Sequence, residues 1–125
     1  MLDKWQKWSD TSERPFESIF TKDDLLTEAM LYLVSDSVAT AMWPYAGFAT
    51  EPFGLMPGQT IDVPYGYSIF DDPLHPRPPR TFMSHSRAQL RFWRDHKGGG
   101  HFPMLQQTDV LAKDIDDFAR SLTTR

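Results

Sequence analysis

The chain has 125 residues, which is enough for one ordinary domain with a hydrophobic core and too few for two. Its hydrophobic content of 40% and charged content of 24% are typical of a folded globular protein rather than a disordered one. The formal net charge of −4 excludes the basic footprint of a nucleic-acid-binding domain, and the absence of cysteine excludes disulfides and thiol chemistry.

The sequence gives no sign of targeting to a membrane or of export. No apolar run approaches the roughly 18 residues that a membrane-spanning helix needs. The N-terminal stretch MLDKWQKWSDTSER is mixed and charged, unlike a signal peptide. We therefore expect a soluble protein; its compartment stays open, with the cytoplasm as the favoured location.

The first predicted element is a helix over residues 21–34, TKDDLLTEAMLYLV. Thr21 can cap its N-terminus and Asp24 occupies the third helical position, which is the pattern of a capping box. Helical character resumes in SDSVATAMW and should end near Pro44, because proline interrupts a helix interior. Residues 47–60 contain three glycines and two prolines and predict a loop. The apolar face of the first helix consists of Leu25, Leu26, Ala29, Met30 and Leu33.

A short strand is predicted over residues 61–70, where β-branched and aromatic residues partly alternate, although Pro64 and Gly66 weaken the pattern. DDPLHPRPPR predicts a turn and a proline-stiffened loop. RAQLRFWRDHK fits a helix, a strand, or a short helix that runs into a strand. The last element is an amphipathic helix over residues 108–122, which Thr108 can cap.

This alternation of strands and helices predicts an α/β protein. Two short strands make a marginal sheet, and parallel strands need cover on both faces. We therefore expect an incomplete sheet that forms part of a larger layered fold.

Two aspartates and one histidine are the leading candidates for chemistry. Asp71 and Asp72 follow the predicted strand, and His101 follows the three glycines of KGGGHF. Ligands bind at the C-terminal ends of strands in open α/β sheets, so an acid and a histidine there could meet. The carboxylate would hold one ring nitrogen as N–H and leave the other free as a base. Taken singly, however, each motif is also typical of an ordinary turn.

Tyr45 is a further candidate, either as an aromatic core residue or as a phenol that donates a hydrogen bond to a developing oxyanion. His75, His85 and His96 have no spacing to one another or to an acid that indicates a metal site. The HExxH, GxSxG and phosphate-loop motifs do not occur.

The motifs in this order resemble the C-terminal part of microsomal-type epoxide hydrolases, which are α/β-hydrolase-fold enzymes. They are WSD, FTKDDLLTEAMLYL, PYAGF, VPYGYSIFDD, GGHF and LAKDIDDF. The resemblance runs from about Trp8 to the last helix. It implies a partial α/β-hydrolase fold, in which residues 1–60 provide cap-derived helices and a loop. Residues 61–125 would then provide the last two strands, the loops that carry the acid and the histidine, and the C-terminal helix.

In that family a nucleophilic aspartate opens the epoxide and forms an alkyl-enzyme ester, which a histidine-activated water hydrolyses to a vicinal diol. The resemblance implies His101 as the water-activating base, and Asp72 as its orienting acid with Asp71 as the alternative. Tyr45 falls where a tyrosine that donates to the epoxide oxygen is expected. The glycines would let the backbone turn sharply so that the imidazole faces the site. The implied partners are a small apolar epoxide and water, with no cofactor and no metal.

Three departures from the family pattern qualify this resemblance. FDDP is one residue shorter than the usual spacing before the acid, so Asp71 and Asp72 both stay open. GGHF is followed by MLQQTD instead of a glutamate and then a proline, which we expect to loosen the start of the last helix. The nucleophile, its elbow turn, the oxyanion-hole segment and a second tyrosine belong to sequence that would precede Met1.

We therefore expect a C-terminal piece that is inactive without an N-terminal half. The alternative is a non-catalytic truncated product that binds a partner through its exposed sheet edge and apolar faces.

Overall fold

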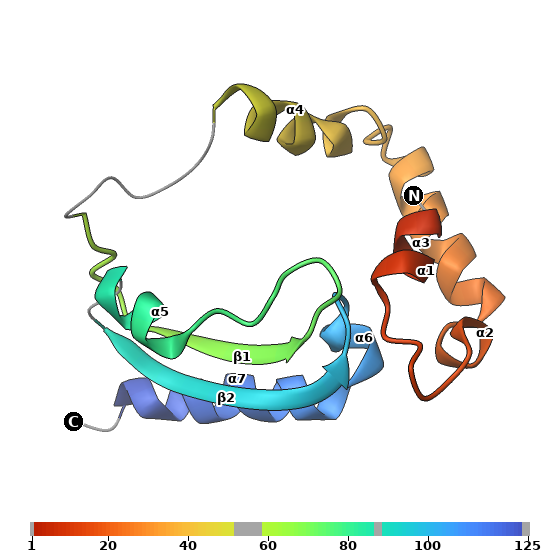
Figure 1. Cartoon of the computed structure of the whole chain (residues 1–125). Helices are drawn as coiled ribbons and strands as arrows, with labels where there is room; N and C mark the ends of the chain where they lie inside the picture. The colour runs from red at the N-terminus through yellow and green to blue at the C-terminus, as the bar shows by residue number, and fades with distance from the viewer. Residues whose placement is uncertain (1, 52–58, 87–88, 124–125) are drawn as a thin grey trace.

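A computed structural model describes residues 2–51, 59–86 and 89–123 (Figure 1). Within these residues, no helix has the length and apolar character to cross a lipid bilayer. The elements in chain order are α1 (Leu2–Trp8), α2 (Phe16–Ile19), α3 (Lys22–Val34), the 3₁₀ turn η1 (Thr40–Met42), α4 (Trp43–Thr50), β1 (Tyr65–Asp71), α5 (Arg80–Ser86), β2 (Leu90–Gly99), α6 (Pro103–Gln106) and α7 (Thr108–Thr123).

The sheet consists of β1 and β2, which pair in parallel. Residues 72–89 connect the two strands and include α5, since parallel neighbours need a crossover rather than a tight turn. Helix α7 contacts both strands and lies along one side of the sheet in Figure 1. The predicted α/β class is therefore confirmed as a mixed structure with a two-stranded parallel sheet.

Helix α3 begins where the sequence predicts. The Thr21 side chain accepts a hydrogen bond from the Asp24 N–H at 3.1 Å, and the Asp24 carboxylate accepts one from the Thr21 N–H at 2.9 Å. This capping box satisfies two backbone donors that a helix N-terminus otherwise leaves without partners.

The prediction that helical structure ends near Pro44 is wrong. Pro44 lies in the first turn of α4, where the N–H that proline lacks would have no intrahelical partner anyway. The predicted loop over 47–60 is also wrong in its first part, because α4 continues to Thr50. Residues 52–58 of that prediction lie outside the described residues.

Two further boundaries differ from the predictions. Strand β1 begins at Tyr65 rather than at residue 61, and the ambiguous connector becomes β2 from Leu90 onward. Thr108 does not cap α7: it is the first helical residue, and its hydroxyl donates to the Met104 carbonyl at 2.7 Å. Only Gln107 separates α6 from α7, so α6 lies where the chain before an N-cap residue would otherwise run.

The buried hydrophobic core of the described residues is small: it comprises Trp5, Phe20, Ile69 and Phe70. The accessible surface of 9467 Å² exceeds the roughly 6,800 Å² expected for a compact monomer of this mass. The predicted apolar face of α3 is not buried within this chain, since Leu26, Met30 and Leu33 are each at least half exposed. Helices α3 and α4 lie away from the sheet in Figure 1, which accounts for this exposure.

A buried carboxylate joins α7 to the sheet. Asp114 has 2% of its surface exposed and interrupts the apolar stripe of α7. Its two carboxylate oxygens lie 2.5 Å from Arg94 Nη1 and 2.5 Å from His96 Nε2, both on β2. Burial by itself would raise the pKa of Asp114, but hydrogen bonds from His96, Ser68 and Arg94 outweigh it and hold the pKa below its ordinary value.

Replacing this carboxylate should destabilise the chain in a pH-dependent way. We expect Asp114→Ala to lower the free energy of unfolding at pH 7 by about 1–3 kcal/mol, because it removes the carboxylate partner of His96, whose side chain is only 13% exposed. The native pKa of Asp114 lies below the unfolded value of about 3.9, so its stabilisation is complete above that value and is lost as the pH falls through the native pKa. Urea unfolding between pH 7 and pH 3 should show the difference between wild type and variant shrinking on acidification.

Asp116→Ala is the matched control on the same helix. Asp116 is exposed and pairs with Arg120 one turn away, an interaction worth about 0.3–0.5 kcal/mol. Equal effects of the two substitutions, or a loss at Asp114 that does not change with pH, would contradict the role assigned to Asp114.

Candidate active site

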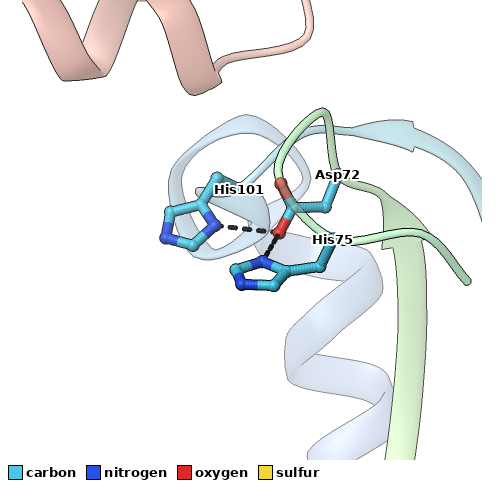
Figure 2. A group of neighbouring side chains, drawn as sticks. All are labelled: Asp72, His75 and His101. Carbon is cyan, nitrogen blue, oxygen red and sulfur yellow. Dashed lines mark hydrogen bonds and ion pairs between the residues drawn. The ribbon is translucent and has the colours of Figure 1, made fainter. Parts of the chain in front are cut away.

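The C-terminal ends of the two parallel strands bring Asp72 and His101 together. Strand β1 ends at Asp71 and β2 at Gly99, and these two residues are partners in the register of the sheet. Asp72 and His101 therefore leave the same edge of the sheet. His101 Nδ1 lies 2.9 Å from Asp72 Oδ2, and Figure 2 shows the two side chains directed at one another. The His101 side chain is 30% exposed and that of Asp72 18%, so the pair lies at the surface but is partly shielded from water.

The three glycines before His101 are required by backbone conformation and by space. Gly98, Gly99 and Gly100 have φ values of +65°, +92° and +59°, a region that residues with a Cβ atom rarely adopt. A Cβ atom at Gly99 would lie 2.6 Å from the Phe70 ring, and one at Gly100 would lie 2.5 Å from the Asp10 backbone nitrogen. The turn that carries His101 can therefore pack against its neighbours only because it has no side chains.

The N-terminal segment fixes the position of the His101 loop. The His101 N–H donates to the Trp8 carbonyl at 2.8 Å, and the two rings are in edge contact with centroids 5.1 Å apart. The Gln106 amide donates to the Asp10 carbonyl at 3.0 Å and accepts from the Asp10 N–H at 3.1 Å. Gln106 lies in the stretch that departs from the family pattern, and here it joins the N-terminal segment to the His101 loop.

The Asp72 carboxylate is held in its ionised form. Partial burial would raise the pKa of Asp72, but hydrogen bonds from His101, His75 and the Leu74 N–H outweigh it and keep the pKa below its ordinary value. An ionised carboxylate can only accept hydrogen bonds, so His101 donates from Nδ1. The Nε2 atom of a neutral His101 ring is then the one with a free lone pair.

Asp71, the alternative acid, makes different contacts. Its carboxylate accepts hydrogen bonds from Arg77 Nε at 2.9 Å and Nη2 at 2.7 Å, and from the Gly98 N–H at 2.8 Å. Arg77 also reaches Asp95 and the His96 carbonyl. Asp71 thus ties the start of the glycine turn to the proline-rich loop, while Asp72 is the carboxylate bonded to His101.

Tyr45 lies on α4, more than half exposed, at an apolar pocket of about 360 Å³. No hydrogen bond from Tyr45 to Asp72 or His101 occurs in the described part of the chain. The pocket nevertheless adjoins the pair, because Trp8 and Phe102 line it and both rings contact the His101 ring. Its walls include Trp5, Trp8, Tyr32, Met42 and Phe102.

His75 is a neighbour of this pair that sequence spacing did not reveal. Its Nδ1 lies 2.9 Å from the same Asp72 Oδ2 atom that bonds His101, as Figure 2 shows. The sequence spacing of His75 to an acid indicates no metal site, whereas the structure places His75 with Asp72 and His101 in a group that could hold a metal ion. The sequence signal for this contact is the Asp-x-x-His spacing of Asp72 and His75. A turn brings the two side chains together, and in this turn the Leu74 N–H donates to Asp72 Oδ1 at 2.8 Å.

The sequence of this chain is similar to those of proteins named epoxide hydrolase. A protein named "Putative epoxide hydrolase" from Stigmatella aurantiaca (strain DW4/3-1) is 28% identical over 125 residues, which is 100% of this chain and 27% of that protein. One of the same name from Dothistroma septosporum (strain NZE10 / CBS 128990) is 30% identical over 117 residues, 93% of this chain and 26% of that protein. "Epoxide hydrolase 1" of Sus scrofa is 26% identical over 128 residues, which is 94% of this chain and 27% of that protein.

This chain is therefore homologous to the C-terminal quarter of proteins named epoxide hydrolase, and it spans about a quarter of the length of the curated relatives that it matches. No family model matches the sequence, and no solved structure matches it.

Proposed function

We propose that this chain provides the base and the orienting acid of an epoxide-hydrolase active site. The hydrogen bond between His101 Nδ1 and Asp72 Oδ2 is the observation that carries the proposal. It occurs in a chain homologous to epoxide hydrolases, at the sheet edge where open α/β proteins bind ligands. Neither the pair nor the homology would suffice alone, because acid–histidine pairs also occur as purely structural contacts.

In this proposal His101 acts on the alkyl-enzyme ester that forms when a carboxylate opens the epoxide. Nε2 of His101 takes a proton from a water molecule while the water oxygen attacks the carbonyl carbon of the ester. The bond between that carbon and the substrate oxygen then breaks, the imidazolium returns the proton to the substrate oxygen, and the diol leaves as the carboxylate is regenerated. Asp72 holds the ring with Nε2 free and stabilises the imidazolium that forms when Nε2 takes the proton. The low pKa of Asp72 supports this role, because the acid must stay ionised to do it.

The apolar pocket beside His101 is the proposed site for the hydrocarbon part of the substrate. It is lined mainly by aromatic side chains and is wide enough for a small apolar epoxide. Tyr45, at this pocket, is the proposed donor to the epoxide oxygen; its phenol would stabilise the alkoxide as the ring opens.

We further propose that the chain has a partial α/β-hydrolase fold, with cap-derived helices in residues 1–60 and the catalytic loops in residues 61–125. The homology to the C-terminal quarter of epoxide hydrolases supports this division. The proposal assigns no nucleophile among these residues. The carboxylate that opens the epoxide would come from a polypeptide corresponding to the remaining three quarters of the relatives.

The test combines the purified chain with that second polypeptide, made separately from a relative, and measures conversion of a small apolar epoxide to diol. We expect Asp72→Asn to lower the rate by about 10²-fold or more, because an amide no longer selects the productive tautomer of His101. Asp71→Asn is the matched control, since Asp71 bonds Arg77 and Gly98 rather than His101. A larger loss in Asp71→Asn than in Asp72→Asn would reverse the assignment of the acid.

Binding to another polypeptide without catalysis is a second candidate function. The large apolar surface favours it: Leu33 of α3 and both Trp43 and Phe48 of α4 are at least 63% exposed. Such a surface is characteristic of protein interfaces. Co-elution of the chain with the second polypeptide in size-exclusion chromatography, combined with no diol formation, would favour this function over the enzymatic one.

A further inference from the structure

Three metal-ligating side chains from two loops converge on one point. Asp72 and His75 belong to the loop after β1, and His101 belongs to the turn after β2. Each offers one ligand atom, and the three atoms all lie within 4.8 Å of one another. Figure 2 shows both imidazoles directed at a single carboxylate oxygen. The proposed hydrolase mechanism uses Asp72 and His101 but gives no role to His75.

We propose that Asp72, His75 and His101 form a binding site for a divalent zinc-type cation. Two imidazole nitrogens with one carboxylate oxygen form a common ligand set for Zn²⁺, with a fourth position left open to water or substrate. The site is built from this chain's own residues, and its existence does not depend on the hydrolase proposal.

The distances from the two imidazole nitrogens to the carboxylate oxygen fit a small movement rather than a rearrangement. Both Nδ1 atoms are 2.9 Å from Asp72 Oδ2, whereas donors around a tetrahedral Zn²⁺ ion lie about 3.3 Å apart when its bonds are about 2.0–2.1 Å. Each nitrogen would have to move outward by a few tenths of an ångström. The His75 side chain is 71% exposed and can make that adjustment without displacing a packed neighbour.

The hydrogen bond from the Leu74 N–H to Asp72 leaves the required oxygen available. Asp72 Oδ1 is bonded to the Leu74 N–H at 2.8 Å, so the carboxylate is oriented by one oxygen and presents the other, Oδ2, to both imidazoles. The two rings are stacked with centroids 5.7 Å apart and an interplanar angle of 26°, and each presents its Nδ1 atom to Asp72 Oδ2. Such support of a ligating carboxylate is typical of metal sites.

Zinc binding and water activation would exclude one another at His101. The ion takes the place of the proton on Nδ1, and in the neutral ring that proton moves to Nε2. The lone pair that would accept a proton from water is then lost. This consequence rests on the proposed function, while the existence of the site does not.

Titration calorimetry of the full chain with zinc chloride, after treatment with a chelator, tests the proposal. We expect one equivalent of Zn²⁺ to bind. Loss of a group that merely supports a ligand costs 10–100-fold in metal affinity, so loss of a ligand in His75→Ala should weaken binding by about 100-fold or more. Asp71→Asn, the neighbouring carboxylate bonded to Arg77, should change the affinity by less than about threefold.

Histidine ring NMR with the metal gives a second readout that requires no variant. The ring signals of His75 and His101 should shift on adding one equivalent of Zn²⁺, while those of His96, held by Asp114, should not. No saturable binding, binding unchanged in His75→Ala, or a shift confined to His96 would each overturn the proposal. Circular dichroism of His75→Ala checks that the exposed substitution leaves the fold intact, and His75→Gln serves as a replacement if it does not. Diol formation is not measured in either experiment, so a negative result leaves the acid–base assignment standing.

Discussion

His101→Ala is expected to lower diol formation by about 10²–10⁴-fold when the chain is combined with the polypeptide that supplies the nucleophile. The physical reason is that Nε2 of His101 is the proposed acceptor of the proton from the attacking water. Opening of the epoxide does not need this base, so the alkyl-enzyme ester should still form and then accumulate. Mass spectrometry of the nucleophile-bearing polypeptide should show an added mass equal to that of the epoxide.

The control is the association of the two polypeptides. His101→Ala should elute with its partner in the same complex as the wild-type chain, which shows that the loss is chemical rather than structural. Diol formation at the wild-type rate, or a loss of activity without any trapped ester, would contradict the role proposed for His101.

Gly100→Ala is expected to destabilise the chain by about 2–5 kcal/mol. A non-glycine residue in the left-handed region costs about 1–2 kcal/mol, and overpacking adds about 1–3 kcal/mol. Gly100 has φ of +59°, and the new Cβ atom would lie 2.5 Å from the Asp10 nitrogen and 2.9 Å from the Trp8 carbonyl oxygen. Both contacts are backbone atoms and cannot move aside as a flexible side chain can. Urea unfolding followed by tryptophan fluorescence measures the loss.

Gly47→Ala is the matched control, with the opposite expected sign. Gly47 lies within α4, and a Cβ atom there would meet nothing within 4 Å. Alanine should therefore stabilise the helix by about 0.5–1 kcal/mol. Equal effects of the two substitutions would show that the glycine turn does not impose the strain inferred from its geometry.

Local signals in the sequence were sufficient for several parts of the structure. The capping box of α3 depends on residues only three positions apart, so Thr21 and Asp24 predict it without tertiary information. The glycine run before His101 likewise indicates a backbone with positive φ. The meeting of an acid with His101 also followed from general rules, because parallel strands end at one sheet edge.

Other parts depend on tertiary contacts that spacing does not encode. Which of the two aspartates bonds His101 depends on tertiary contacts, because Arg77 and the Gly98 N–H bind the carboxylate of Asp71. The burial of Asp114 within an apolar stripe depends on Arg94 and His96 of a distant strand. The position of Pro44 does not by itself predict its role, because proline interrupts helix interiors but is favoured in the first turn of a helix, where the structure places it.

The tautomer of His101 is the most direct test of the central claim, that Asp72 fixes this ring with Nε2 free to act as a base. Long-range ¹H–¹⁵N NMR of the full chain, with a chelator present and the His101 ring neutral, assigns the ring proton to one nitrogen. The claim predicts that Nδ1 carries the proton in the wild-type chain and that this preference weakens in Asp72→Asn. A wild-type ring protonated at Nε2, or one whose tautomer is the same with and without the Asp72 carboxylate, would contradict it.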